Sequence, residues 1–385
     1  MTKQEIAEIK KLLTPKKCSI TRICGCYVDG EKNKKTELKQ AFLALPEEEM
    51  FKYFEILRKA LSGNIGKNLL TLEFPLASEE TGGTQDFLLR LRDSKLKDDI
   101  LLEEFYDRII DNYEFVGNYL ILVVHDVYDV PGRTQDGLEM EDASDEVYEY
   151  ILACICPVEL SKPGLSYNAV ENTFQNRIRD WVVGLPDTGF LFPAFNDRGS
   201  DIHSTLYDSK DPEELKGSFV DTLLGCPLPL SAGSQKETFQ TLVEETLGDD
   251  CDIETVKNIH DKLNEMAEEH KDEPQPLVLD KNEVKTILAG SGVSNDRLAQ
   301  FDRHYDETAG EATSLFASNV MNTRTFEVKT PDVVIKVNPE RTDLIETKVI
   351  NGRECLVIEL GGSVVVNGIN VRAGGIADGE DEEEY

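Results

Sequence analysis

Long apolar runs are missing from this sequence. No stretch of its 385 residues approaches the ~20 apolar residues that a membrane-spanning helix needs. The opening segment MTKQEIAEIKKLL has few apolar positions, and charged residues interrupt them, which is unlike a signal peptide. We therefore expect neither a membrane span nor a secretory leader.

The common signatures of nucleotide and hydrolytic chemistry are also missing. The sequence contains no G-x-x-x-x-G-K-[ST] phosphate loop, no G-x-G-x-x-G opening a helix, no H-E-x-x-H motif and no G-x-S-x-G elbow. His260 and His270 are ten residues apart on one predicted helix, so they cannot share a metal. The sequence predicts no cofactor.

Positive charge is scarce outside the first part of the chain. The formal net charge is −33, which favours solubility and disfavours a general polyanion-binding surface. Residues 1–75 hold 14 Lys and Arg against 10 Asp and Glu, whereas the remaining residues hold 27 basic and 64 acidic side chains. Basic residues are densest between Lys10 and Lys35, and the chain finishes ADGEDEEEY. We expect this acidic tail, from Gly375, to be disordered.

Cysteine is too sparse for a disulfide framework, since 385 residues hold only eight. We predict free thiols in a reducing cytoplasm. Because side chains alternate along a strand, Cys24 with Cys26, and Cys154 with Cys156, would each place two thiols on one face. These four sulfurs are candidates for a zinc site if the strands are neighbours. However, structural zinc generally uses C-x₂₋₄-C spacing and free cysteine is a common core residue, so we predict no metal.

Local signals predict an N-terminal region that mixes helices and strands. Thr2 and Glu5 form a capping box for a first helix, and Asp29-Gly30 is a hairpin signal after a strand. Pro46 suits the first turn of a helix, and two amphipathic helices follow the connector 76–83. Apolar runs predict strands at 18–28, 118–130, 148–160 and 187–195. A long acidic loop over 131–146 is predicted between the second and the third of these strands.

The pattern becomes helical from Asp211 and then turns to strands. Asp211 to Glu214 and Ser234 to Glu237 resemble capping boxes, and an amphipathic helix covers 252–270, with shorter ones at 280–289 and 294–307. The final region is predicted to be a β-meander, because short apolar runs are separated by turn signals at Asn351-Gly352, Gly361-Gly362 and Asn367-Gly368.

These elements predict an α+β protein with a mostly antiparallel sheet, packed helices, a helical middle region and a C-terminal β-meander. At roughly 100–200 residues per domain, the length suits two or three domains, and 40% hydrophobic residues suffice for sizeable cores. We expect an N-terminal domain over 1–210, a helical region over 211–312, a meander over 313–374 and a tail over 375–385.

The stretch GLPDTGFLFPAFNDRGSDIHS, residues 184–204, offers the main catalytic candidates. Asp201 and His203 could form a carboxylate–imidazole pair, which His125 and Asp126, at the end of an apolar strand, could join. With Asp129, His125 and Asp126 could instead bind a hard cation such as Mg²⁺. The favoured interpretation is structural: Phe190 and other aromatic residues fill the core, and the chain leaves through a polar turn. A catalytic triad needs geometry that sequence neighbours rarely supply.

The basic segment offers a candidate contact for nucleic acid. Clustered Lys and Arg beside Tyr27 would suit phosphates and bases. The alternative is a solvated hairpin, or an internal partner for the acidic tail. The residues that would contact phosphates are Lys16, Lys17, Arg22, Lys34 and Lys35.

Several strings together resemble a known family: RICGCYVDG, LSKPGLSY, IRDWVVGLPDTGFLFPAFNDR, GSDIHS, PLSAGSQKETFQ and IKVNPER. The chain resembles, over nearly its whole length, a family of cytosolic proteins from anaerobic Gram-positive bacteria that carries a domain of unknown function. The resemblance implies a bacterial cytoplasmic protein and brings no activity or ligand. In outline, the layout is also similar to acidic, two-domain nucleoid-associated proteins of bacteria, an analogy of fold alone.

The sequence leaves three functions open. The leading hypothesis is a non-enzymatic cytoplasmic protein that binds a macromolecule, nucleic acid among the candidates, because basic charge is segregated from an acidic body. A second is a hydrolase or nuclease-like enzyme that uses the His/Asp candidates. A third is a protein–protein adaptor with an exposed apolar patch. The sequence gives no oligomeric state.

Overall fold

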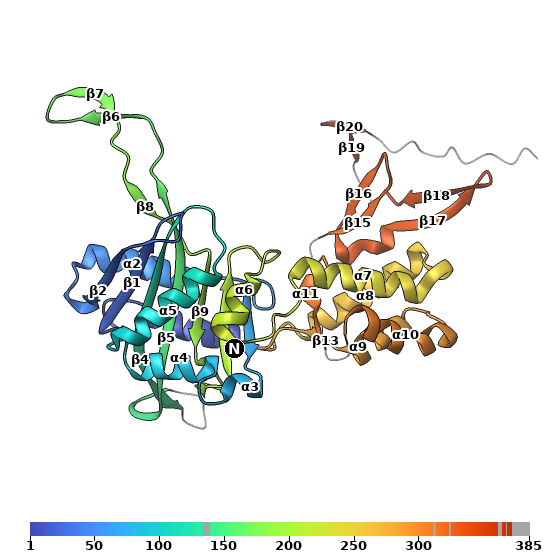
Figure 1. Cartoon of the computed structure of the whole chain (residues 1–385). Coiled ribbons are helices and arrows are strands. Elements are labelled where there is room, and N and C mark those ends of the chain that lie inside the picture. Colours follow the sequence, from blue (N-terminus) through green and yellow to red (C-terminus); the bar gives the residue numbers. More distant parts are fainter. Residues whose placement is uncertain (134–138, 311–312, 323–324, 361–363, 367, 372–385) are drawn as a thin grey trace, which may run out of the picture. The chain divides into compact units, whose positions relative to one another are not determined.

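The computed structural model describes residues 1–133, 139–310, 313–322, 325–360, 364–366 and 368–371. The chain divides into two compact units (Figure 1). The first comprises Met1–Phe239 with Asp272–Val278, and the second comprises Gln240–Lys271 with the chain from Leu279 onward. No helix in the described ranges has the length and apolar character to cross a membrane.

The first unit is built on one large antiparallel sheet, which confirms the predicted α+β class. Its strands are hydrogen-bonded in the order β2-β1-β4-β5-β9-β12-β3, and β8 pairs with the far end of β5. Every neighbouring pair runs antiparallel. The bounds are β1 (Arg22–Val28), β2 (Lys34–Ala41), β3 (Leu69–Glu73), β4 (Asn118–Arg133), β5 (Glu139–Leu160), β8 (Trp181–Val183), β9 (Thr188–Phe192) and β12 (Ser204–Ser209).

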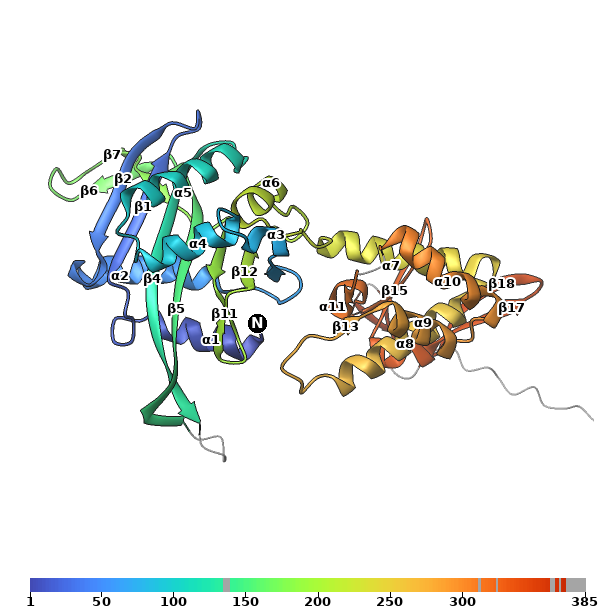
Figure 2. The same ribbon diagram turned by 60° about the horizontal axis from the view of Figure 1, so that its bottom comes forward.

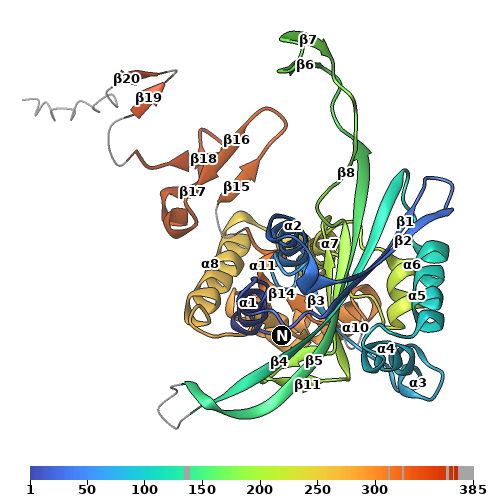
Figure 3. The ribbon, with the colours of Figure 1, turned by 90° about the vertical axis from the view of Figure 1, so that its left-hand side faces the viewer.

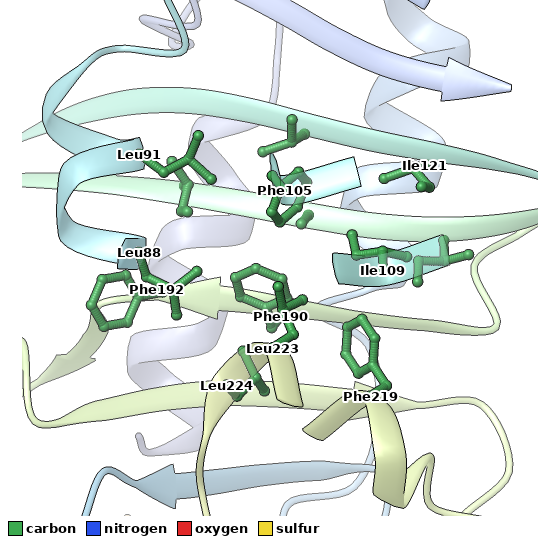
Figure 4. Packing of buried hydrophobic residues seen from close by; sticks show 14 of the residues in the cluster. Leu88, Leu91, Phe105, Ile109, Ile121, Phe190, Phe192, Phe219, Leu223 and Leu224 are labelled. Atoms are coloured by element: carbon green, nitrogen blue, oxygen red, sulfur yellow. The ribbon is translucent and has the colours of Figure 1, made fainter. Parts of the chain in front are cut away.

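Helices cover both faces of this sheet (Figure 3). One face is covered by α4 (Thr84–Asp93), α5 (Asp99–Asn112) and a short π-helix (Val220–Leu224). These helices bury aromatic and aliphatic side chains of the strands (Figure 4). On the other, α1 (Lys3–Leu12) and α2 (Glu47–Lys59) pack on a second apolar cluster. Burial on both faces explains why the strands read as nearly continuous apolar runs.

Local capping chemistry fixes several of these boundaries. Thr2 accepts from the Glu5 backbone and Glu5 accepts from the Thr2 backbone, so the predicted capping box is confirmed. The predicted turn after β1 is confirmed too: the Asp29 carboxylate accepts from the backbone N–H groups of Glu31 and Asn33 and closes the hairpin to β2. Asp side chains commonly accept hydrogen bonds from backbone N–H groups a few residues further on, and these bonds stabilise turns.

The stretch 184–204 leaves the core through a polar turn, as the favoured interpretation predicted. Phe190 and Phe192 in β9 are buried, and β10 (Ala194–Asn196) and β11 (Gly199–Asp201) form a short hairpin after them. Asp197 and Arg198 occupy the left-handed region at the tip, with φ of 50° and 58°. The Arg198 guanidinium reaches Glu8 on α1 at 3.1 Å and holds the tip against that helix.

Three local predictions were wrong. Residues 211–216 form no helix, because the Asp211 side chain caps its own turn by accepting from the Glu213 backbone. The helix predicted to start at Ser234, α7 (Ala232–Leu247), begins earlier than predicted, since Ser231 caps it by accepting from the Ser234 backbone. The described parts of the predicted loop over 131–146, residues 131–133 and 139–146, are strand: β4 and β5 continue there as a two-stranded ribbon with irregular register around Pro131 (Figure 2). The rest of this predicted loop, 134–138, lies outside the described residues.

The second unit combines helices with short hairpins. Three of its helices lie close to their predicted bounds: α8 (Ile253–Glu269), α9 (Lys281–Gly290) and α10 (Asn295–Thr308). Where a meander was predicted, the described strands form separate two-stranded sheets. β14 (Leu315–Phe316) pairs with β13 (Val278–Leu279), and the later strands pair as hairpins. These pairs are β15 (Phe326–Lys329) with β16 (Val334–Val337), β17 (Ile345–Ile350) with β18 (Arg353–Ile358), and β19 (Val364–Val366) with β20 (Ile369–Val371). Residues 372–385, which include the predicted disordered tail, lie outside the described residues.

Candidate functional site

His125 and Asp126, predicted to act together, point to opposite faces of the sheet. They are consecutive in β4, and consecutive side chains of a strand alternate. His125 lies on the α4 face, where its Nε2 is 2.6 Å from Glu149 Oε1. Burial lowers the pKa of His125, which outweighs the opposing effect of the Glu149 carboxylate. The pair therefore cannot converge on one substrate atom or one cation.

Asp126 is part of a buried network on the α1/α2 face. Its Oδ1 accepts from the backbone N–H groups of Ser19 and Val127, and its Oδ2 accepts from the Tyr150 hydroxyl. Burial raises the pKa of Asp126 to about 6, although these hydrogen bonds oppose the shift. The contacts join the segment before β1 to the central strands, which is a structural role.

Asp201 and His203 are close in sequence but do not form the predicted carboxylate–imidazole pair. Asp201 accepts from the backbone N–H of His203 and from the Asn196 amide, which is turn chemistry. The His203 ring instead lies 2.6 Å from Glu79, at the end of α3 (Leu76–Glu79), and this contact raises the pKa of His203. His203 is exposed. The four catalytic candidates thus have separate partners.

The two C-x-C pairs lie on opposite faces of the sheet. β4 runs between β1 and β5, and Cys24 and Cys26 belong to the α4/α5 cluster while Cys154 and Cys156 belong to the α1/α2 cluster. The idea of a shared zinc site is therefore wrong. Throughout the described parts of the chain, no three His, Cys, Asp or Glu side chains are placed to hold a metal ion.

The predicted basic surface is partly neutralised by acidic side chains of the same unit. Lys34 in β2 forms ion pairs with Glu103 and with Asp107 of α5, the second at 2.6 Å. Lys35 lies 2.6 Å from Asp29. The other three predicted contacts lie outside β2. Lys16 and Lys17 are in the turn after α1, and Arg22, at the start of β1, is paired with the last residue of β2, Ala41.

A polar cluster just before the start of β9 escaped the sequence analysis. The Tyr113 hydroxyl donates to Asp187 Oδ2 at 2.6 Å, and Lys216 Nζ lies 3.7 Å from the same oxygen. Burial and the Asp187 carboxylate raise the pKa of Tyr113. Nearby, burial raises the pKa of Asp208 to about 8. Asp187 ties α5 to the chain after β12, which gives this cluster a structural function.

A hairpin with several exposed apolar side chains in the first unit also escaped prediction. Between β5 and β8 the chain forms β6 (Leu165–Asn168) and β7 (Thr173–Asn176), which pair with each other as a separate two-stranded sheet. We call residues 161–180 the β-arm. Figures 1 and 3 show that it projects away from the sheet and its covering helices. The hydrogen bonds from Ser161 N to Asp180 O and from Arg177 N to Gly164 O continue the ladder along it.

The β-arm is amphipathic. Register places Leu165, Tyr167 and Phe174 on one face, with exposed fractions of 77%, 55% and 71%. The aromatic rings of Tyr167 and Phe174 stand directly opposite each other, 5.5 Å between centroids. The other face carries only polar side chains, namely Ser166, Asn168, Thr173 and Gln175.

The tip of the β-arm is an ordered turn. Asn168 Oδ1 accepts from the backbone N–H groups of Val170 and Glu171, and the Tyr167 hydroxyl donates to Asn172 Oδ1 at 2.6 Å. At the root, Trp181 in β8 is half-exposed. Alternation in LSYN spans four residues and TFQN holds a single apolar residue, which is too little to predict a strand.

The fold and this surface define an α+β protein with a projecting amphipathic hairpin. The chain belongs to the DUF4317 family, a domain of unknown function whose profile matches residues 1–369. A comparison with curated proteins finds no significant match.

Proposed function

We propose that the chain is a non-enzymatic macromolecule-binding protein and that the β-arm is its contact element. The observation that carries the proposal is the exposed apolar face of Leu165, Tyr167 and Phe174. Strands with one apolar and one polar face normally bury the apolar face, and an isolated two-stranded hairpin is marginally stable in water. A partner that covers the face would supply the missing burial.

The chemistry of the β-arm favours a protein partner. Exposed aliphatic side chains accompany the aromatic ones, among them Val170 at the tip and Ile178 near the root. Tyr and Trp are enriched at protein interfaces, where they supply large apolar area with one polar group. Nucleic acid is the competing ligand, since bases also stack on exposed aromatic rings. The basic residues predicted earlier, Lys16 and Lys17 among them, would then add phosphate contacts.

The cellular setting belongs to the same proposal. All eight cysteines lie within the described residues and none forms a disulfide. Free thiols are typical of a reducing compartment, so we propose a bacterial cytoplasmic protein, in line with the resemblance of the sequence. A hydrolase that uses His125, Asp126, Asp201 and His203 is the alternative, although the geometry does not favour it.

A photo-crosslinking amino acid in the full chain tests the function. p-Benzoylphenylalanine would replace Phe174 on the apolar face or, as the matched control, Gln175 on the polar face, in cells that make the protein. We expect a crosslinked species from position 174 and little from 175. Sensitivity of that species to protease or to nuclease distinguishes the two partner classes. Absence of any crosslink from position 174 would reject the β-arm as a contact element.

A further inference from the structure

We propose that Lys10, Arg58 and Lys59 form a binding site for a phosphate group. These three side chains, which we call the cation cluster, belong to the last turns of α1 and α2. Both helices cover the same face of the sheet (Figure 3). The inference goes beyond the proposed function, because the cation cluster is not part of the β-arm and its test does not involve the arm.

Hydrogen bonds between the two helix ends hold the cation cluster together. Lys10 Nζ donates to Ser62 Oγ at 2.6 Å, and the Ser62 hydroxyl donates to the Arg58 carbonyl at 2.5 Å. The Arg58 guanidinium lies over the Phe54 ring and donates to the Leu13 carbonyl, just beyond α1, at 2.5 Å. Two of the three cations are therefore held in place before a ligand binds, which lowers the entropic cost of binding.

The positive charge of the cation cluster has no ion-pair partner among the described residues. Within that part of the chain, none of its three side chains forms an ion pair with a carboxylate. By contrast, every lysine of β2 pairs with an acidic side chain. Burial and the positive charges of Arg58 and Lys59 lower the pKa of Lys10. An anion bound among the three cations would relieve this repulsion.

Asp208 does not supply the missing negative charge at neutral pH. Lys59 lowers the pKa of this carboxyl group, but burial has the larger and opposite effect, and the pKa is about 8. Asp208 is therefore mostly protonated and uncharged at neutral pH. The charge of Lys59 remains available for a ligand.

The helix dipoles explain only part of this concentration of positive charge. A helix C-terminus carries about half a negative charge, which favours basic residues in the last turn. The last turns hold Lys10 and Lys11 in α1, and Arg58 and Lys59 in α2. Four positive charges against about one negative charge from the two dipoles leave a surplus of about three. This surplus stands out in a chain whose net charge is −33.

The donor groups suit a phosphate group better than a carboxylate. Arg58 has five N–H donors and Lys10 has three, and each uses one of them within the described residues. A phosphate group offers three strong acceptor oxygens and up to two negative charges, so it can bond to all three cations at once. A carboxylate offers two oxygens and one charge.

Two kinds of ligand carry this group: a small phosphate compound and the backbone of a nucleic acid. The compact cation cluster suits a single phosphate group. Lys16 and Lys17, exposed in the turn after α1, would extend the contact along a backbone. Separate experiments on the full-length protein distinguish the two sources.

Thermal unfolding with inorganic phosphate tests the site itself. A ligand that binds the folded state raises the unfolding temperature. We expect a larger rise for the native protein than for Lys10→Gln with Lys59→Gln, or for Lys59→Gln alone at its exposed position. Lys97→Gln, between α4 and α5, removes the same charge elsewhere and should respond like the native protein. Because phosphate also stabilises proteins by exclusion from their surface, the difference between the proteins is the site-specific effect.

Fluorescence anisotropy with a labelled DNA duplex tests the second source. The logarithm of the association constant falls with the logarithm of the salt concentration, by about 0.9 for each phosphate contact. If the backbone binds at the cation cluster, Lys10→Gln with Lys59→Gln should make this slope shallower by about 1.8, whereas Lys97→Gln should keep the native slope. Circular dichroism verifies that each variant is folded.

The outcomes separate the two sources and can overturn the site. A phosphate effect that depends on Lys10 and Lys59, without binding of DNA, identifies a small phosphate compound as the ligand. Binding of DNA that depends on the same two residues identifies the nucleic-acid backbone. The proposal is overturned if neither the phosphate effect nor any binding of DNA changes in Lys10→Gln with Lys59→Gln and in Lys59→Gln.

Discussion

The Tyr150 hydroxyl donates a 3.0 Å hydrogen bond to Asp126 Oδ2 inside the first unit. The other carboxylate oxygen accepts from the backbone of Ser19, which lies just before β1. One buried carboxyl group thus connects β4, β5 and the segment that leads into β1. Buried polar groups are tolerated when they are hydrogen-bonded in this way, and removal of the acceptor would leave two backbone donors and a phenol without a partner.

We predict that Asp126→Asn flattens the dependence of stability on pH in the acidic range. The folded pKa of about 6 lies above the ordinary value of 3.8 because of burial. The stabilising contribution of the protonated group is therefore complete below pH 3.8 and is lost as the pH rises through 6. A shift of two pH units corresponds to a change on the order of 3 kcal/mol in the free energy of unfolding.

Urea unfolding of Asp126→Asn and of the native sequence at several pH values between 4 and 8 measures this difference. Asn keeps an acceptor for the two backbone N–H groups, so the network survives in neutral form. The variant should match the native protein near pH 4 and exceed its stability near pH 7. Asp111→Asn, at an exposed position of α5, controls for the change in net charge. A constant difference at all pH values would contradict the prediction.

Ionisation of Asp208 should also destabilise the fold as the pH rises, and over a wider pH range than ionisation of Asp126. Burial raises its pKa to about 8, and the strand register sets it opposite Gly189, close to Cys154 and to Lys59 at the end of α2. Stability contributed by the neutral acid is complete below pH 3.8 and is lost as the pH rises through 8. We expect Asp208→Asn to be more stable than the native protein at pH 8 by several kcal/mol, on the order that the shift implies.

The two carboxyl groups can be distinguished by the pH at which the gain in unfolding free energy of each Asn variant levels off. For Asp126→Asn the gain in unfolding free energy should level off just above pH 6, whereas for Asp208→Asn it should continue to grow toward pH 8. Denaturant melts at half-unit pH intervals resolve these limits. A gain for Asp208→Asn that levels off by pH 6 would show that Asp208 ionises readily in the folded protein.

The buried cysteines should resist alkylation in the native protein. Burial raises the pKa of Cys24 and of Cys26 to about 11 and that of Cys156 to about 12. The thiolate is the reactive form, so little is present at neutral pH. We expect iodoacetamide to label the exposed Cys251 first, and the four C-x-C thiols only after unfolding. Peptide mass spectrometry reads out each site, and rapid native labelling of Cys154 would contradict its burial.

Local interactions made part of the fold predictable from the sequence. The capping box of Thr2 and Glu5 and the Asp29 turn each depend on side chains within four residues, so their signals are complete in a short string. The faces occupied by Cys24 and Cys154 depend on the pairing register across β4, which no local string contains. For this reason the thiols were predictable as core residues but their separation was not.

The β-arm and the candidate site were unpredictable for a related reason. Residues 165–168 alternate over only four positions, and 173–176 hold one apolar residue, Phe174. Exposure of these apolar side chains also contradicts the usual inference that apolar side chains are buried. His203 illustrates the same limit, because its partner Glu79 is 124 residues away. Sequence proximity suggested Asp201 as the partner of the His203 ring. In the structure the Asp201 carboxylate instead accepts from the backbone N–H of His203.

The ion pair between Arg198 and Glu8 should couple the hairpin of β10 and β11 to α1. The guanidinium approaches Glu8 Oε1 at 3.1 Å and also donates to the Pro131 carbonyl at 3.2 Å, and both charged side chains are largely buried. The Tyr128 hydroxyl donates to the same Glu8 oxygen at 2.7 Å. Partly buried, multiply bonded pairs are worth more than exposed ones, which contribute about 0–1 kcal/mol.

A double-mutant cycle measures this coupling. Arg198→Ala and Glu8→Ala should each destabilise the protein by roughly 1–3 kcal/mol, because each leaves a partner group desolvated without its bond. The double variant should lose less than the sum, with a coupling energy of about 1 kcal/mol or more. Arg303→Ala with Glu307→Ala, an exposed pair on α10, is the matched control and should show little coupling. Additive effects at positions 198 and 8 would mean that the hairpin is held by its apolar contacts alone.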